Sequence, residues 1–157
     1  MRTYLVALAL SLAPAVALAG AEMPDVTGKY KVSTEGSTTQ LQAGQKGKLV
    51  LSISLSESAH LSEEAPLRIA VSGTNGAAPE KTSLVYADQV SQKAPGQKYA
   101  NPVVFEVPFS VAAKAPPITA TVDAKMTFFV CTADICARQQ QQVSLPVKVC
   151  RGRAGTC

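Results

Sequence analysis

The sequence contains no tryptophan and only one histidine, and aromatic residues make up just 5% of it. The chain has four cysteines, but His60 is far from them in sequence, so it lacks the closely spaced ligand sets that zinc sites use. It also has no glycine-rich loop of the kind that cradles phosphates. Helical periodicity is nearly absent. These shortages argue against metalloenzymes and nucleotide-dependent enzymes, and we expect no cofactor.

Charged residues are scarce as well, at 17% of the chain, with 15 Lys and Arg against 11 Asp and Glu. The basic residues are spread along the sequence, and their one local excess is Lys148, Arg151 and Arg153 near the C-terminus. Nucleic-acid-binding domains gather Lys and Arg on one face in order to neutralise phosphates. We therefore predict no nucleic-acid partner, and we interpret the basic end as solvated chain.

Long hydrophobic runs are confined to the N-terminus. Arg2 precedes the apolar stretch Tyr4–Val16, and Ala17-Leu18-Ala19 then supplies the small-x-small pattern that a signal peptidase accepts. A membrane anchor is the alternative, but this stretch is short and interrupted by proline, whereas a span needs about 20 unbroken apolar residues. We therefore predict a signal peptide over residues 1–19, cleaved before Gly20.

The remainder of the chain fits one domain. We assign residues 20–149 to that domain and residues 150–157 to a flexible tail that bears cysteines. No later segment is long and apolar enough to cross a bilayer. We therefore expect a periplasmic or secreted protein that does not insert into the membrane after signal cleavage, and that is a monomer.

Alternation of apolar and polar residues dominates the domain, which is the period-two signal of half-buried strands. Turns at Gly73-Thr74-Asn75-Gly76 and near Pro95-Gly96 separate the runs, and we treat Glu57–Pro66 as a loop. Short alternating strands with Gly and Pro turns favour an all-β, antiparallel immunoglobulin-like β-sandwich of about seven strands, with an open barrel as the alternative. The predicted strands lie at 28–34, 49–56, 67–72, 82–87, 105–111, 118–130 and 143–149.

Four cysteines remain after the signal peptide, and four cysteines allow three disulfide connectivities. Closeness in sequence favours Cys131 with Cys136 and Cys150 with Cys157. The first pair lies at the tip of a predicted hairpin, and the alternation along the preceding strand places Cys131 on the outer face, within reach of solvent. We therefore take Cys131 and Cys136 as the candidate catalytic residues, since a short exposed bridge can be reduced and reformed. The alternative is a structural staple.

Two other features offer less. His60 precedes the acidic residues Glu63 and Glu64, but no nucleophile lies nearby in sequence, so we interpret it as a surface histidine. The four glutamines at 139–142 are expected to line a solvated strand edge.

The run Met126-Thr-Phe-Phe-Val-Cys-Thr-Ala-Asp-Ile-Cys136, followed by Val143–Val149, resembles the periplasmic N-terminal domain of the DsbD family of thiol-disulfide interchange reductases. The resemblance covers residues 28–149 and implies an immunoglobulin-like sandwich whose cysteine pair, here Cys131 and Cys136, exchanges disulfides with thioredoxin-fold partners. The family has one residue more between its cysteines than this chain has. Its membrane-spanning and thioredoxin-like domains have no counterpart here, so a relay would need separate electron donors.

Two functional hypotheses therefore stand. In the first, the domain is an exported thiol-disulfide exchange module that passes reducing equivalents to thioredoxin-fold proteins. In the second, it is a non-catalytic binding or structural module in which the bridge only braces a hairpin.

Overall fold

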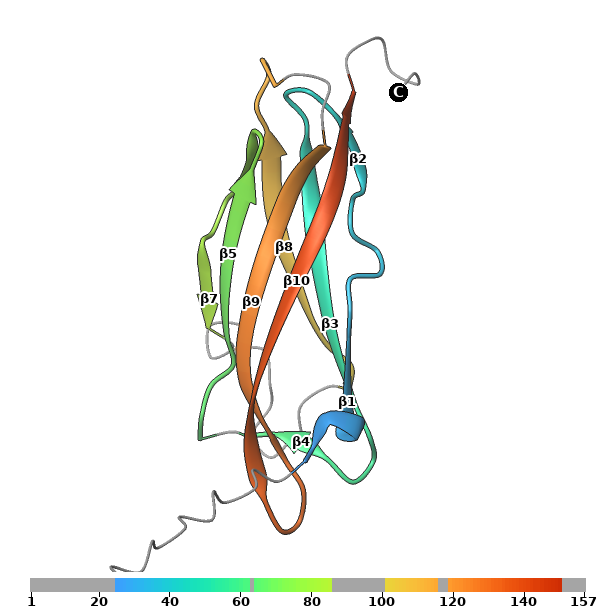
Figure 1. Cartoon of the computed structure of the whole chain (residues 1–157), viewed down its shortest axis with the longest axis vertical. Helices are drawn as coiled ribbons and strands as arrows, with labels where there is room; N and C mark the ends of the chain where they lie inside the picture. The colour runs from blue at the N-terminus through green and yellow to red at the C-terminus, as the bar shows by residue number, and fades with distance from the viewer. Residues whose placement is uncertain (1–24, 63, 86–100, 116–118, 151–157) are drawn as a thin grey trace, which may run out of the picture.

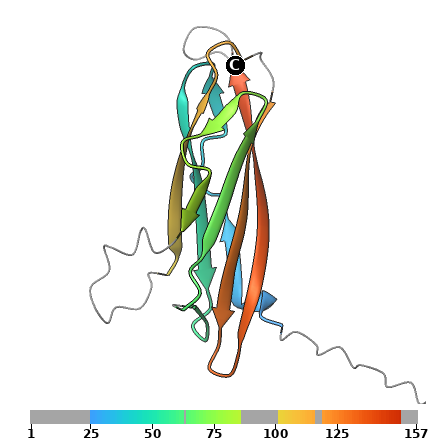
Figure 2. The same cartoon turned by 90° about the vertical axis from the view of Figure 1, so that its left-hand side faces the viewer.

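Two β-sheets lie face to face, as the two perpendicular views show (Figures 1 and 2). The computed structural model describes residues 25–62, 64–85, 101–115 and 119–150. The predicted signal peptide, its cleavage point before Gly20, and the tail beyond Cys150 lie outside these residues, as do the turn near Pro95-Gly96 and the outer ends of two predicted strands, at 86–87 and Ile118. Within the described ranges, no helix is long and apolar enough to cross a membrane.

One sheet has four strands and the other has six. A single 3-10 turn, Thr27–Lys29, precedes the first strand. The four-stranded sheet has the order β1 (Tyr30–Ser33), β3 (Lys46–Leu55), β8 (Val103–Val111), β6 (Ala77–Pro79). The six-stranded sheet has the order β2 (Gln40–Gln42), β10 (Cys136–Cys150), β9 (Thr119–Cys131), β5 (Arg68–Thr74), β7 (Ser83–Val85), and the short β4 (His60–Leu61) also pairs with β9.

This arrangement confirms the predicted immunoglobulin-like sandwich. In chain order, β1, β3, β5, β6, β8, β9 and β10 occupy the positions of strands A to G, with A, B, E and D in one sheet and C, F and G in the other. The described residues form ten strands in place of about seven, because β2, β4 and β6 lie outside the seven predicted ranges. These three strands have only two or three residues each, which is too short for a clear periodic signal. One pair among the described strands, β2 with β10, is parallel, and the other pairs are antiparallel as predicted.

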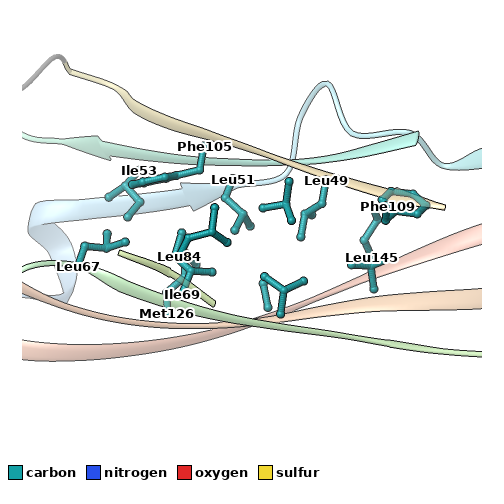
Figure 3. Packing of buried hydrophobic residues seen from close by; sticks show 14 of the residues in the cluster. Leu49, Leu51, Ile53, Leu67, Ile69, Leu84, Phe105, Phe109, Met126 and Leu145 are labelled. Atoms are coloured by element: carbon teal, nitrogen blue, oxygen red, sulfur yellow. The ribbon is translucent and has the colours of Figure 1, made fainter. Parts of the chain in front are cut away.

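Alternation places one face of each sheet in a shared core. On β3, Leu49, Leu51 and Ile53 are fully buried, and across the sandwich β9 buries every second residue from Ala120 to Val130. Figure 3 shows these side chains filling the space between the layers. Full burial of one large apolar side chain stabilises the fold by about 1.5–3 kcal/mol, so the sandwich is held mainly by this layer.

The connection from β5 to β6 carries the chain from one sheet to the other. Asn75 and Gly76 both have positive φ, at 54° and 88°, which is the backbone of a tight two-residue turn and matches the turn predicted there. A side chain on Gly73 would place its Cβ 2.2 Å from the carbonyl oxygen of Ala77. Glycine is therefore required where the two strands cross.

Candidate functional site

The cysteine pair closes the longest hairpin of the molecule, whose tip projects at the lower end in Figure 1. β9 ends at Cys131, β10 begins at Cys136, and the two residues face each other in the ladder and form a disulfide. Their Cα atoms lie 4.0 Å apart. The next pair toward the tip is hydrogen-bonded, since Thr132 N donates to Ile135 O at 2.8 Å. The cysteines therefore occupy a non-hydrogen-bonded pair, where facing side chains are closest.

The loop between the cysteines is a compact turn. The side-chain oxygen of Thr132 accepts hydrogen bonds from the backbone N–H groups of Asp134 and Ile135, each at 3.4 Å. Ile135 is one of the two large hydrophobic residues most exposed among the described part of the chain, at 37%. A partner that approaches the tip would meet this side chain beside the bridge.

The two cysteines differ sharply in exposure. Cys136 is exposed, whereas Cys131 is only 2% exposed. This corrects the prediction that solvent or a partner reaches Cys131. The residue does lie on the outer side of the alternation, but β4 adds a strand beside β9 at that position, so Cys131 has neighbours on both flanks. The prediction of a loop over Glu57–Pro66 is therefore wrong at His60–Leu61, which form β4.

The strand β4 brings His60 to the bridge. His60 is paired with Cys131 across the β4–β9 ladder, and Leu61 is paired with Val130. Leu61 is buried with the core, so His60 points to the opposite, outer face, where it is exposed. Facing residues in antiparallel strands have Cβ atoms about 4.5–5.5 Å apart. His60, Cys131 and Cys136 therefore form one row across three strands, on the same face of the sheet.

Formal charges around this row are few. Asp134, in the hairpin turn, and Arg138, two residues into β10, are both exposed, and neither forms an ion pair with a described residue. Glu64, which follows His60 in sequence, is exposed, and Glu63 lies outside the described residues. Nowhere in the described ranges do three His, Cys, Asp or Glu side chains gather in a way that could hold a metal ion.

Tyr30 of β1 holds the tip half of the hairpin from across the sandwich. Its hydroxyl donates to Gln139 Oε1 at 3.0 Å and accepts from Gln141 Nε2 at 2.7 Å, and its ring packs edge-on against Phe128 with centroids 5.2 Å apart. The prediction of a wholly solvated glutamine run is thus only half right. Gln139 and Gln141 turn inward to Tyr30, while Gln140 and Gln142 are exposed.

The second cysteine pair is described only at one end. Cys150 is 5% exposed and is disulfide-bonded. Cys157, its predicted partner, lies outside the described residues, so that pairing stays a prediction.

Sequence reasoning found the bridge and missed the histidine beside it. No sequence pattern links His60 to Cys131, because β4 has only two residues and its pairing is set by the tertiary fold. The comparisons with known proteins add no family assignment: no protein-family model and no curated protein sequence matches the chain.

Proposed function

We propose that this protein is an exported thiol-disulfide exchange module, and that the Cys131–Cys136 bridge passes reducing equivalents to thioredoxin-fold partners. The observation that carries the proposal is the asymmetry of the bridge, in which one cysteine is exposed at a hairpin tip and the other is buried. Exchange needs one accessible sulfur for the intermolecular step and a second sulfur held close by for the intramolecular step.

In this proposal the two sulfurs have different roles, which their difference in exposure supports. Cys136 is the sulfur that a partner can reach, so it forms the mixed disulfide. Cys131 is buried and faces Cys136 directly, so it leaves when the bridge is reduced and attacks when the mixed disulfide is resolved.

The chemical step balances with a dithiol as the only reductant. A partner thiolate attacks Cys136 Sγ, the bond to Cys131 Sγ breaks, and Cys131 receives the electron pair and then a proton. The partner's second thiol, after losing its proton, attacks the partner sulfur of the mixed disulfide and releases the Cys136 thiolate. Two electrons and one proton have then moved from the partner to the bridge, since the partner began with one thiolate and the bridge ends with one. Reversal of the same steps delivers them to the disulfide of a second, thioredoxin-fold protein.

His60 supports this step through its place beside the leaving sulfur. A cation near a cysteine favours the thiolate over the thiol, and a thiolate of lower pKa leaves faster. His60 is therefore a positioning residue for charge at Cys131, and Cys136 remains the point of contact with the partner.

The proposal places the protein in an oxidising compartment, the periplasm or the extracellular space, as the predicted signal peptide over residues 1–19 requires. Disulfides persist in such compartments and are rare in the cytosol. The bridge is compatible with this location.

A brace for the hairpin is the second candidate, favoured by the burial of Cys131. In that case the domain is a non-catalytic binding or structural module. The two functions separate in a trapping experiment.

The structure selects the variant for trapping. Cys131→Ser leaves the exposed Cys136 as a nucleophile and removes the sulfur that would resolve a mixed disulfide. Expressed in a bacterial periplasm, this variant is expected to accumulate covalent adducts with thioredoxin-fold proteins that are released by reductant. Cys136→Ser is the matched control, because it keeps only the buried sulfur and should trap far less.

Equal trapping by both variants, or none by either, contradicts the assignment. If neither variant traps a thioredoxin-fold protein while both remain folded, the bridge is a brace and the exchange function is wrong.

A further inference from the structure

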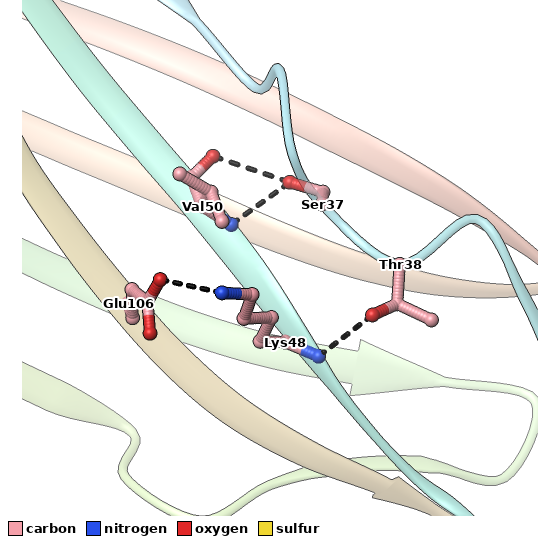
Figure 4. Close-up of polar contacts among 5 residues, drawn as sticks. All are labelled: Ser37, Thr38, Lys48, Val50 and Glu106. Atoms are coloured by element: carbon pink, nitrogen blue, oxygen red, sulfur yellow. Dashed lines mark hydrogen bonds and ion pairs between the residues drawn. The ribbon is translucent and has the colours of Figure 1, made fainter.

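The edges of the two sheets differ in how much of the strand backbone is covered by other parts of the chain. β1, β6 and β7 are edge strands of only three or four residues, and short edges discourage pairing with other chains. β3 extends beyond β1, but the chain after β1 covers it. Ser37 Oγ accepts from the N–H of Val50 and donates to its carbonyl oxygen, and Thr38 Oγ1 accepts from the N–H of Lys48 (Figure 4). The backbone N–H of Thr38 also donates to the carbonyl oxygen of Lys48.

Among the described residues, the outer edge of β10 has no such cover. β2 pairs with β10 only from Lys148 to Cys150, so the stretch from Cys136 to Val147 borders β9 on one side and no described strand on the other. Figure 1 shows β10 as one long strand, with β2 beside its upper end alone. This is the longest unpaired edge in the described part of the chain.

The backbone groups on that edge can be identified by parity. In an antiparallel pair, alternate residues direct both their N–H and C=O groups toward the neighbouring strand. The N–H of Lys148 donates to Thr39 O and therefore points away from β9. Pro146, two residues earlier, has no N–H and so fits the same orientation. The backbone N–H and C=O groups of the even-numbered residues of β10 therefore point away from β9. Arg138, Gln140 and Gln142 share this parity with Ser144, and no described residue pairs with their backbone groups.

Side chains on this edge do not prevent pairing. Natural edges are protected by lysines, prolines or bulges. Between Arg138 and Pro146 the β10 edge carries only glutamine, valine, serine and leucine, with no charge. The edge is therefore able to accept another strand over about four outward-facing residues.

We propose that a second copy of this chain occupies the edge, with the two β10 strands antiparallel about a two-fold axis near Gln141. In this register Gln140 of one copy faces Gln142 of the other, and Arg138 faces Ser144. Each pair exchanges two backbone hydrogen bonds. The contact is isologous, so it closes at two copies and does not propagate into a fibre. It does not rest on the proposed redox function.

Charge complementarity singles out this register. Ser144 is paired with Asp123 of β9 and hydrogen-bonds to its carboxylate. Arg138 of one copy thus lies two strand spacings, about 9–10 Å between Cα atoms, from Asp123 of the other, within reach of the two extended side chains. Symmetry supplies this ion pair twice.

The neighbouring registers are worse. One slip pairs Gln140 of one copy with Gln140 of the other and moves Arg138 opposite Gln142 of the other copy. Gln142 is paired with Lys125 within its own copy, so this register brings the positive charges of Arg138 and Lys125 together. The opposite slip moves Arg138 opposite Pro146, which has no N–H to donate.

Neither Arg138 nor Asp123 forms an ion pair with a described residue of its own copy, so both charges can pair across the contact. Both ion pairs among the described residues lie on the other sheet, Lys46 with Glu80 and Lys48 with Glu106. There the hydrogen bond and the charge of Glu80 raise the pKa of Lys46. Arg138 has no such partner within its own copy in the described ranges.

Analytical ultracentrifugation of the purified protein tests the proposal, with non-reducing gels to exclude covalent dimers. The wild-type chain is expected to show a reversible monomer–dimer equilibrium below about 1 mM, as edge contacts of modest area are weak. Arg138→Glu should weaken the dimer roughly tenfold, since it alters two symmetric contacts. Asp123→Arg should do the same, and the double reversal should restore the association to within about threefold.

Arg68→Glu is the matched control, because it changes the net charge equally on the same face but lies on β5, away from the edge. It should leave the dimer unchanged. Gln140→Pro removes one outward N–H and should abolish the dimer without unfolding the domain, since Pro146 already occupies β10 at the same parity.

A chain that stays monomeric up to about 1 mM overturns the proposal. So does a double reversal that fails to recover the association, or an Arg68→Glu effect equal to that of Arg138→Glu. Should Gln140→Pro fail to fold, the charge-reversal set decides alone. If the edge instead binds only an extended peptide from another protein, the second copy is not its occupant.

Discussion

His60 lies directly opposite Cys131 in the β4–β9 ladder, although the two residues are far apart in sequence. The pairing puts the one histidine of the chain on the same face as the bridge, next to the sulfur that is buried. A hairpin staple needs no such neighbour, whereas an exchange site gains from a nearby group whose charge favours a thiolate. The row His60, Cys131, Cys136 is therefore the arrangement on which the functional argument depends.

Replacing His60 tests this arrangement. His60→Gln should slow reduction of the bridge by a small dithiol several-fold, because glutamine keeps a polar side chain beside Cys131 but cannot carry a positive charge. The measurement is the rate ratio of wild type to variant at one pH and one dithiol concentration. A ratio near one contradicts the role of His60.

The bridge should contribute little to stability. Cys131→Ala/Cys136→Ala is expected to lower the free energy of unfolding by about 2 kcal/mol, because a closed loop of about six residues removes little entropy from the unfolded chain. Denaturant unfolding measures the change. A loss above about 5 kcal/mol would show that the bridge is a principal support of the fold and would favour the brace.

Tyr30 should stabilise the tip half of the β9–β10 hairpin through its hydroxyl. Tyr30→Phe keeps the ring against Phe128 and removes the hydrogen bonds to Gln139 and Gln141, so we expect a loss of about 1–2 kcal/mol in the free energy of unfolding. Gln142→Ala is the control, since Gln142 is exposed and its change should stay within about 0.5 kcal/mol. Equal effects from the two variants would contradict the account of Tyr30.

Gly73 should tolerate no side chain. Gly73→Ala places a Cβ against the Ala77 carbonyl and should cost about 1–3 kcal/mol or displace β6 from β8. Gly28→Ala is the matched change, because its Cβ would meet nothing within 4 Å. Thermal unfolding of both variants decides, and comparable midpoints would mean that the strands can separate at the crossing without cost.

Much of the fold follows from alternation in the sequence. The long strands β3, β8 and β9 were predicted within a few residues, since each buries every second side chain. β10 was predicted only from Val143. In its first half the inward positions hold Gln139 and Gln141, which bond to Tyr30, so the apolar alternation that marks a strand is missing there.

The candidate site was predictable only in part. The bridge between Cys131 and Cys136 follows from their short spacing, which places both at one hairpin. The burial of Cys131 does not follow, because it depends on β4, a two-residue strand that no periodic pattern reveals. For the same reason His60 could be placed beside the bridge only once the fold was known.

The reduction potential of the Cys131–Cys136 bridge tests the central claim most directly. Equilibration of the purified protein with glutathione or dithiothreitol buffers, followed by thiol alkylation and mass analysis of the peptide that spans Cys131 and Cys136, reports that bridge separately from Cys150. An exchange module should have a potential above about −300 mV, within reach of thioredoxin-fold donors. A value well below that limit would mean that the bridge stays oxidised in any cellular buffer, and the exchange function would be wrong.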